Sequence, residues 1–109
     1  MSFRVNLTLR AETDVSEILQ YIRERSPQGA ATWADRFDQV LAELTESANR
    51  KPLAPENGDH EEEIRHVVFK TRVGKKYRAI FLIREDLVLV THVRGPGQDL
   101  VPRQEMPVS

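Results

Sequence analysis

The sequence predicts an α+β domain of two layers, in which a helical hairpin packs on a largely antiparallel sheet. Three patterns lead to this prediction: one segment of alternating apolar residues, two segments with an apolar residue every three or four positions, and three strand-like segments separated by short turns. Alternation is typical of half-buried strands, and the longer spacing is typical of amphipathic helices. The expected order is β-α-α-β-β-β, in a domain of residues 1–95 followed by an irregular tail at 96–109.

The first strand is expected over residues 3–10, where the apolar positions recur every second residue and so share one face. These positions are Phe3, Val5, Leu7 and Leu9. Thr13 or Asp14 can cap the helix that follows, and Glu17 stands three positions after Asp14, as in a capping box. The apolar residues at 15, 18, 19 and 22 give this helix a single stripe, and it should end near Ser26.

A second helix is expected from Pro27 to about Ala48. Proline disfavours helix in the residue before it but suits the first helical position, so Ser26-Pro27 marks a stop and a restart. Two amphipathic helices with so short a break between them form a hairpin. The apolar stripe of the second helix consists of Trp33, Phe37, Val40, Leu41 and Leu44. The aromatic residues Tyr21, Trp33 and Phe37 are expected in the core.

The second half of the chain changes to strand periodicity. Residues 49–63 hold two prolines, a glycine and a cluster of acids, which indicates a loop. Strands are expected at 64–70, 77–84 and 87–94, with turns at 71–75 and at Glu85-Asp86. The strand at 77–84 is apolar on both faces at its middle, as a central strand should be.

The last strand carries a histidine, His92, with the same parity as Val88 and Val90, so it is expected on the face of those valines. Arg94 shares this parity and ends the strand. The residues Gly95-Pro96-Gly97 then terminate it, and the tail from Gln98 onward should be irregular or extended.

Composition sets limits on the chemistry. The 109 residues are 39% apolar and 30% charged, which suits one globular domain. The absence of cysteine excludes disulfides and thiolate chemistry. His60, His66 and His92 lack metal-ligand spacing, so neither a metal nor a cofactor is expected. No apolar run approaches the roughly 20 residues that cross a bilayer, and the N-terminus lacks a signal-peptide stretch. A cytoplasmic protein without membrane contact is therefore expected.

Charge is segregated along the chain, although the net charge is only −1. Residues 12–63 contain 13 acidic and 5 basic residues, a balance of −8, whereas residues 64–84 contain 7 basic residues and none that is acidic. The basic residues are Arg65, Lys70, Arg72, Lys75, Lys76, Arg78 and Arg84. Such a segment can bind phosphates or an acidic partner. The alternative is a solvated sheet face that balances the acidic, helical half.

Four local patterns, in this order, resemble the RelE/ParE superfamily of bacterial toxins. Residues 11–22 (AETDVSEILQYI) are similar to a stretch that often follows the first strand in the family. Ile64-Arg65 opens the second strand, residues 77–81 (YRAIF) are similar to the family pattern of the third, and residues 89–94 (LVTHVR) to the strand that leads to its "H.R" ending. The resemblance covers about residues 3–94 and implies a RelE/ParE-like fold.

The resemblance implies the toxin of a type II toxin–antitoxin system, which inhibits growth until a cognate antitoxin binds it, with an oligomer of toxin and antitoxin as one possible assembly. Two modes of action are known in the superfamily. RelE-like members are ribosome-dependent endoribonucleases that cut messenger RNA, whereas ParE-like members poison DNA gyrase. The partners implied are therefore an antitoxin and either gyrase or the translating ribosome.

A metal-independent ribonuclease needs a base, a cation for the phosphorane and an acid for the leaving oxygen. Arg78 matches the family's arginine in the third strand and can bind the scissile phosphate, with Arg65 as a second cation. His92 is the acid or base candidate, and Arg94 matches an arginine at the end of the last strand. Each has a structural alternative: an antitoxin-facing or exposed arginine, or a histidine that packs on the sheet.

Other assignments remain open beside these. The loop residues Glu56, Asp59, His60 and Glu61 to Glu63 can offer a base, although acid-rich loops are usually solvated. An RNA-binding sheet would need exposed aromatic side chains, for which Phe69, Tyr77 and Phe81 are the candidates. The basic segment from Arg65 to Arg84 is the predicted antitoxin contact.

One departure from the nuclease pattern decides between the two modes. Where RelE-like nucleases tend to carry His, Tyr, Lys or Arg after the last strand, this chain has Gly95-Pro96-Gly97-Gln98, and no tyrosine follows Tyr77. The near-neutral net charge also disfavours RNA binding, which depends on Lys and Arg. The sequence therefore slightly favours a ParE-like gyrase inhibitor. RelE-like cleavage is the alternative, and a non-toxic RNA- or protein-binding module is the second alternative.

Overall fold

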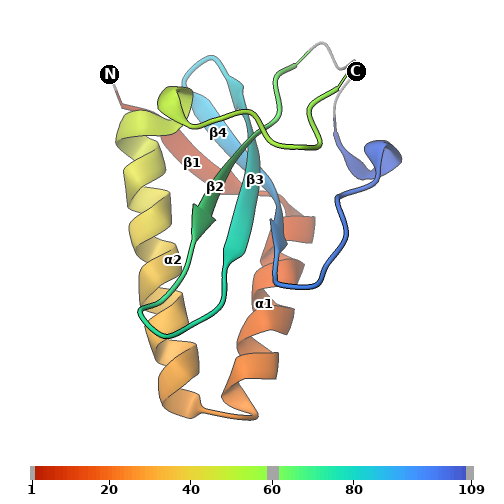
Figure 1. The fold of residues 1–109 in the computed structure, drawn as a ribbon. Helices are drawn as coiled ribbons and strands as arrows, with labels where there is room; N and C mark the ends of the chain where they lie inside the picture. The colour runs from red at the N-terminus through yellow and green to blue at the C-terminus, as the bar shows by residue number, and fades with distance from the viewer. Residues whose placement is uncertain (1, 59–61, 108–109) are drawn as a thin grey trace.

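A hairpin of two helices covers one face of a four-stranded sheet in the computed structural model, which describes residues 2–58 and 62–107 (Figure 1). The elements are β1 (Arg4–Leu7), α1 (Leu9–Arg23), α2 (Pro27–Ser47), β2 (Arg65–Phe69), β3 (Tyr77–Arg84) and β4 (Leu87–Arg94), with 3₁₀ turns at Ala48–Arg50 and Arg103–Glu105. The predicted α+β class and element order are confirmed. None of the helices in the described ranges is both long and apolar enough to cross a membrane.

The sheet has the order β1-β4-β3-β2. Strands β2, β3 and β4 pair antiparallel, as their short connections require. Strand β1 pairs parallel with β4, placing Arg4 opposite Leu87. The helical hairpin occupies the crossover that a parallel pair needs, so the first and last strands of the chain become neighbours.

Helix α1 begins earlier than predicted. The strand ends at Leu7, and Thr8 caps the helix with a side-chain oxygen that accepts a hydrogen bond from the Ala11 N–H at 3.1 Å. The Thr8 hydroxyl also donates to the Thr91 carbonyl at 3.0 Å, which ties the start of α1 to β4. The prediction of a strand to residue 10 and a cap at Thr13 or Asp14 was wrong, because the apolar alternation continues by coincidence through Leu9, which is 79% exposed.

Helix α2 begins where proline chemistry predicted. The Ser26 side chain accepts from the Gly29 N–H at 2.9 Å, and Pro27 occupies the first turn. Trp33 and Phe37 are buried and stack with ring centroids 5.3 Å apart, as the core prediction expected. Tyr21 is 57% exposed, so its assignment to the core was wrong. Its ring lies on the flank of α1 beneath the guanidinium of Arg25.

Two apolar clusters lie on opposite faces of the sheet. The larger fills the space under the helices and includes Trp33, Phe37, Val40, Leu44, Val67, Phe69, Ala79, Phe81, Val88, Val90 and Val93. The smaller lies on the outer face and joins Ile80 and Leu82 of β3 to Ala54, Ile64, Val101 and Met106. Burial on both faces confirms β3 as a central strand.

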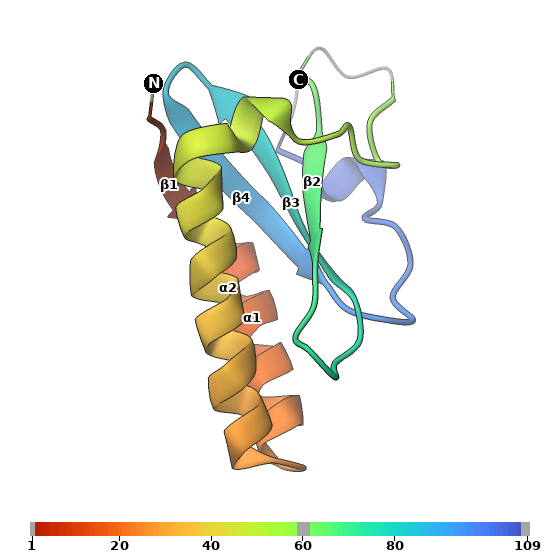
Figure 2. The same cartoon turned by 60° about the vertical axis from the view of Figure 1, so that its left-hand side comes forward.

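The C-terminal segment takes part in this second cluster. Val101 and Met106 are each 5% exposed, and the 3₁₀ turn Arg103–Glu105 lies between them. Figure 2 shows this segment on the side of the sheet away from the helices. The segment is packed, because the outer face of β3 is too apolar to be left to water.

A β-bulge interrupts β4. Phe81 pairs with Val90 and Ile80 pairs with His92, so Thr91 is the extra residue. Before the bulge Val88 and Val90 face the helices, and after it Val93 does. His92 and Arg94 therefore lie on the outer face with Ile80. The prediction that His92 shares a face with Val88 and Val90 was wrong, because one extra residue reverses the alternation.

Candidate functional site

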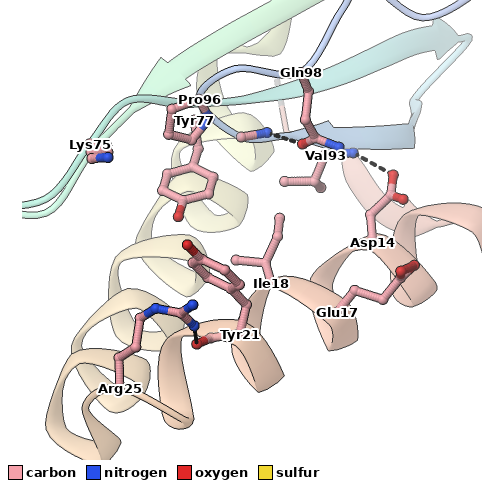
Figure 3. A pocket seen from close by; sticks show the side chains of 11 residues that line it. Asp14, Glu17, Ile18, Tyr21, Arg25, Lys75, Tyr77, Val93, Pro96 and Gln98 are labelled. Atoms are coloured by element: carbon pink, nitrogen blue, oxygen red, sulfur yellow. Dashed lines mark hydrogen bonds between the residues drawn. The ribbon is translucent and has the colours of Figure 1, made fainter.

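A hollow of about 700 Å³ lies between α1 and the adjoining ends of β3 and β4, and we call it the α1 groove (Figure 3). It is lined by Asp14, Glu17, Ile18, Tyr21, Arg25, Lys75, Tyr77, Val93, Gly95, Pro96 and Gln98. These residues come from α1, from the connection before β3, from the ends of both strands and from the break after β4.

The groove is acidic at one end and basic at the other. Asp14 and Glu17 lie toward the start of α1, and Arg25 and Lys75 lie at the far end, with the hydroxyl groups of Tyr21 and Tyr77 facing each other between them (Figure 3). The Arg25 guanidinium stands 3.7 Å from the centroid of the Tyr21 ring, a cation–π contact. Mixed charge beside exposed aromatic surface suits the side chains of a protein partner.

Tyr77 is not a base at neutral pH. Burial, and to a smaller extent the neighbouring Tyr21, raises the pKa of Tyr77 above its usual value of 10.0. The phenol therefore stays protonated and can only donate or accept hydrogen bonds. Tyr77 is thus suited to hydrogen bonding with a bound partner.

Asp14 joins the groove to the rest of the fold. Its Oδ2 accepts from the Val93 N–H at 3.0 Å and its Oδ1 accepts from Arg10 Nε at 3.1 Å. The side chain is 9% exposed. The bulge in β4 leaves the Val93 N–H free for this bond, so a carboxylate in the middle of α1 anchors the helix to the sheet. Sequence reasoning missed this role because it depends on the bulge.

Arg78, the predicted phosphate-binding arginine, forms a bidentate ion pair with Glu56. Its two terminal nitrogens donate to Oε1 and Oε2 at 2.9 and 2.7 Å, and one of them also donates to His66 Nδ1 at 3.1 Å. The Glu56 side chain is only 1% exposed, and its Oε2 accepts a further bond from the Val101 N–H at 3.1 Å. The loop, β3 and the C-terminal segment therefore meet at this carboxylate.

The pKa values of the cluster follow from these contacts. Burial alone would raise the pKa of Glu56, but the hydrogen bonds from Arg78 and from the Val101 N–H lower it to about 2. Burial lowers the pKa of His66, and the adjacent Arg78 charge lowers it further against the pull of Glu56. At neutral pH the cluster is one ion pair beside a neutral imidazole, so Glu56 is not available as a loop base.

His92 is 2% exposed, and its Nδ1 lies 3.0 Å from Thr91 Oγ1. Burial lowers its pKa, and the charges of Arg10 and Arg94 lower it further. The ring is therefore neutral at pH 7. It lies on the outer face and is absent from the lining of the α1 groove, so the structure does not bring it together with Tyr77 or Lys75.

Arg94 follows His92 on the outer face, opposite Arg78 in the β3–β4 register. Its Nε is buried and has no hydrogen-bond partner among the described residues. The side chain lines a second hollow of about 440 Å³, which we call the Arg94 hollow and which it shares with Arg10, Gln98, Asp99, Glu105 and three apolar or glycine residues.

The seven basic residues at 64–84 do not form one face. Arg65, Arg78 and Arg84 pair with Glu63, Glu56 and Glu62, respectively. The acidic loop thus neutralises the basic strands. The other four cations lie exposed in the connection between β2 and β3 and make no ion pair in the part of the chain that is described; they are Lys70, Arg72, Lys75 and Lys76.

Other predicted candidates take clear positions. Phe69 and Phe81 are 3% and 0% exposed, so neither offers a surface for base stacking, and Tyr77 is half-buried. Glu62 and Glu63 hold arginines, while the loop candidates Asp59, His60 and Glu61 lie outside the described residues. Across residues 2–58 and 62–107, no group of three His, Asp or Glu side chains is placed to hold a metal ion.

Comparison with known proteins places this arrangement in a family. Residues 5–100 match the family described as "ParE toxin of type II toxin-antitoxin system, parDE". A solved structure described as "Chromosomal ParDE TA system from P. aeruginosa" is similar in fold, with a TM-score of 0.66 and 14% identity over 86% of this chain and 96% of that one. No curated protein matches the sequence. The predicted superfamily is confirmed, and the chain belongs to the ParE toxin family of type II toxin–antitoxin systems.

Proposed function

We propose that this toxin arrests bacterial growth by binding and inhibiting DNA gyrase, and that it does not cleave RNA. As a member of its family it is the toxin of a toxin–antitoxin pair, with an antitoxin as its partner. The observation that carries the proposal is the ion pair of Arg78 with the buried Glu56. The arginine expected to bind a scissile phosphate already has a full carboxylate partner.

Cleavage at a 2′-hydroxyl would require Arg78 to leave that partner. Removing one member of a buried ion pair costs about 3–5 kcal/mol, because the other charge is left without compensation. The acid–base candidate His92 is equally unsuited, since a ring that is 2% exposed cannot reach a bound nucleotide without rearrangement. Both observations favour the binding mode over the ribonuclease mode.

The α1 groove is our candidate for the surface that the antitoxin covers. Two acids at one end disfavour a phosphate backbone, and the tyrosines with Arg25 and Lys75 at the other end suit an acidic and apolar peptide segment. Lys70, Arg72 and Lys76 extend the basic end, and they are what remains of the basic contact surface predicted from the sequence. Binding there gives a toxin–antitoxin assembly in the cytoplasm, where gyrase acts.

The test combines two assays on the same protein. In cells, the chain is induced while growth and new messenger RNA 5′ ends are followed. In vitro, purified chain is added to a gyrase supercoiling reaction with and without the protein encoded beside it. We expect growth arrest without new cuts, and loss of supercoiling that the neighbouring protein restores. Cuts confined to translated codons would establish the ribonuclease mode and reject the proposal.

A further inference from the structure

Arg94 is a charged side chain whose hydrogen-bonding capacity is unmet. Its Nε is shielded from water and has no acceptor among the described residues, and no ion pair of Arg94 is found there either. A buried donor without a partner is costly, more so when the group is charged, and rarely persists without a reason. The two terminal nitrogens are not buried in this way and make no hydrogen bond to a described residue, so an outside acceptor would bind there.

The neighbouring arginine shows what kind of acceptor fits. Arg78 and Arg94 are cross-strand partners on the outer face, and like charges in that position repel. The fold offsets the charge of Arg78 with the bidentate carboxylate of Glu56. Among the described residues, no carboxylate offsets the charge of Arg94 in this way. The two arginines occupy equivalent positions, and only one has its anion.

The hollow in front of Arg94 defines that anion further. It has about 440 Å³, enough for a side chain, and Asp99 and Glu105 stand on its walls. Glu105 is already engaged with Arg10 at 2.8 Å, so it does not neutralise Arg94. A phosphate with its higher charge would be repelled more strongly by the two acids than a single carboxylate, which can bind end-on to the two terminal nitrogens of Arg94.

We propose that Arg94 binds the carboxylate of an Asp or Glu side chain of the antitoxin. Gln98 lines both the Arg94 hollow and the α1 groove, so one extended segment can occupy the two in sequence. The identity of the partner rests on the antitoxin contact proposed above. The inference concerns affinity for the antitoxin and is independent of whether the toxin's target is gyrase.

The test measures the affinity of purified chain for the protein encoded beside it. Arg94→Gln should weaken binding about 10- to 100-fold, the loss expected for a charge-assisted hydrogen-bond pair. The matched control is Arg103→Gln, which removes an exposed arginine of the C-terminal segment and should change affinity less than about threefold. An unchanged affinity in the Arg94 variant overturns the proposal.

Two further measurements identify the contact. Each Asp and Glu of the antitoxin is replaced in turn by Asn or Gln. The proposal requires that one of these replacements weakens binding to the unchanged toxin but does not weaken binding to the Arg94→Gln variant further. Arg94→Lys, which keeps the charge but lacks the pair of terminal nitrogens, should lose several-fold in affinity while folding normally. A purely structural arginine would instead lower the unfolding midpoint with the antitoxin affinity of the folded fraction intact, and that result rejects the proposal.

The proposed function and this inference fail separately. If the chain binds its antitoxin through Arg94 but leaves supercoiling unaffected, gyrase is the wrong target and the carboxylate site stands. If Arg94→Gln lowers inhibition of gyrase with antitoxin affinity unchanged, the carboxylate belongs to the target, and the assignment to the antitoxin is wrong.

Discussion

Replacing Glu56 with glutamine removes the charge that holds three parts of the chain together. The carboxylate accepts two bonds from Arg78 and one from the Val101 N–H, with 1% of its side chain exposed. Its pKa falls from 4.5 to about 2 on folding, net of the opposing effect of burial. Each factor of ten in proton affinity is worth about 1.4 kcal/mol, so the ionised group contributes about 3 kcal/mol at neutral pH. This contribution agrees with the cost of breaking a buried ion pair, which is about 3–5 kcal/mol.

The pH dependence follows from the direction of the shift. A carboxylate with a lowered pKa stabilises the fold fully above its unfolded pKa, and this contribution is lost as the pH falls through the folded pKa. Glu56→Gln should therefore cost about 3 kcal/mol at pH 7 and about half as much at pH 3, with the difference nearly gone at pH 2. Gln keeps the shape of the side chain, so no cavity contributes.

The assay is urea unfolding of both proteins at pH 7, 5 and 3, followed by tryptophan fluorescence of Trp33 and by circular dichroism. Glu46→Gln removes an exposed carboxylate of α2 and serves as the control, with an expected change within about 0.5 kcal/mol. Equal stability of the Glu56 variant and the wild type at pH 7, or a difference that does not shrink at pH 3, would refute the reasoning.

Three further predictions concern single side chains. Asp14→Ala leaves the buried N–H of Val93 without an acceptor and should lower the free energy of unfolding by about 2 kcal/mol in urea titrations. The exposed control Asp35→Ala should change this free energy little. Glu85 has a φ of 57°, a conformation that glycine adopts without strain, so Glu85→Gly should raise the unfolding free energy by up to about 1 kcal/mol; a lower value would contradict this account of the turn. Because burial lowers the pKa of His92, its ring resonances in NMR should titrate below pH 6.5, and stability should fall as the pH drops past that value; a midpoint above 6.5 would show that the ring is solvated.

Much of the fold could be predicted because local signals agree with the tertiary structure. The bounds of β3 and β4 match the prediction to the residue, since turn residues separate two strongly apolar segments. The start of α2 was equally clear from Ser26 and Pro27. The start of α1 was not, because an apolar residue at position 9 satisfies the strand pattern, and only the Thr8 bonds to Ala11 and β4 reveal the cap.

The candidate site was less predictable, because the side chains that contact one another there are far apart in the sequence. The sequence singled out both Arg78 and Arg94. The path of the loop alone determines that Glu56 pairs with Arg78, and that no described residue pairs with Arg94. A single extra residue, Thr91, reverses the face of everything after it, and no local signal marks it. The α1 groove combines three separate segments of the sequence, so no motif could identify it.

The parallel pairing of β1 with β4 has a consequence for the nascent toxin. Strand β1 is made before the rest of the sheet, but the strand that it pairs with in the described part of the chain is β4, the last strand to be made. Contacts of such long sequence separation form late, since the intervening chain must first be ordered. Until then the apolar face of the sheet is incomplete and no finished groove or hollow exists. The α1 groove and the Arg94 hollow are therefore completed only after the segment from Leu87 onward has been made and has folded against β1.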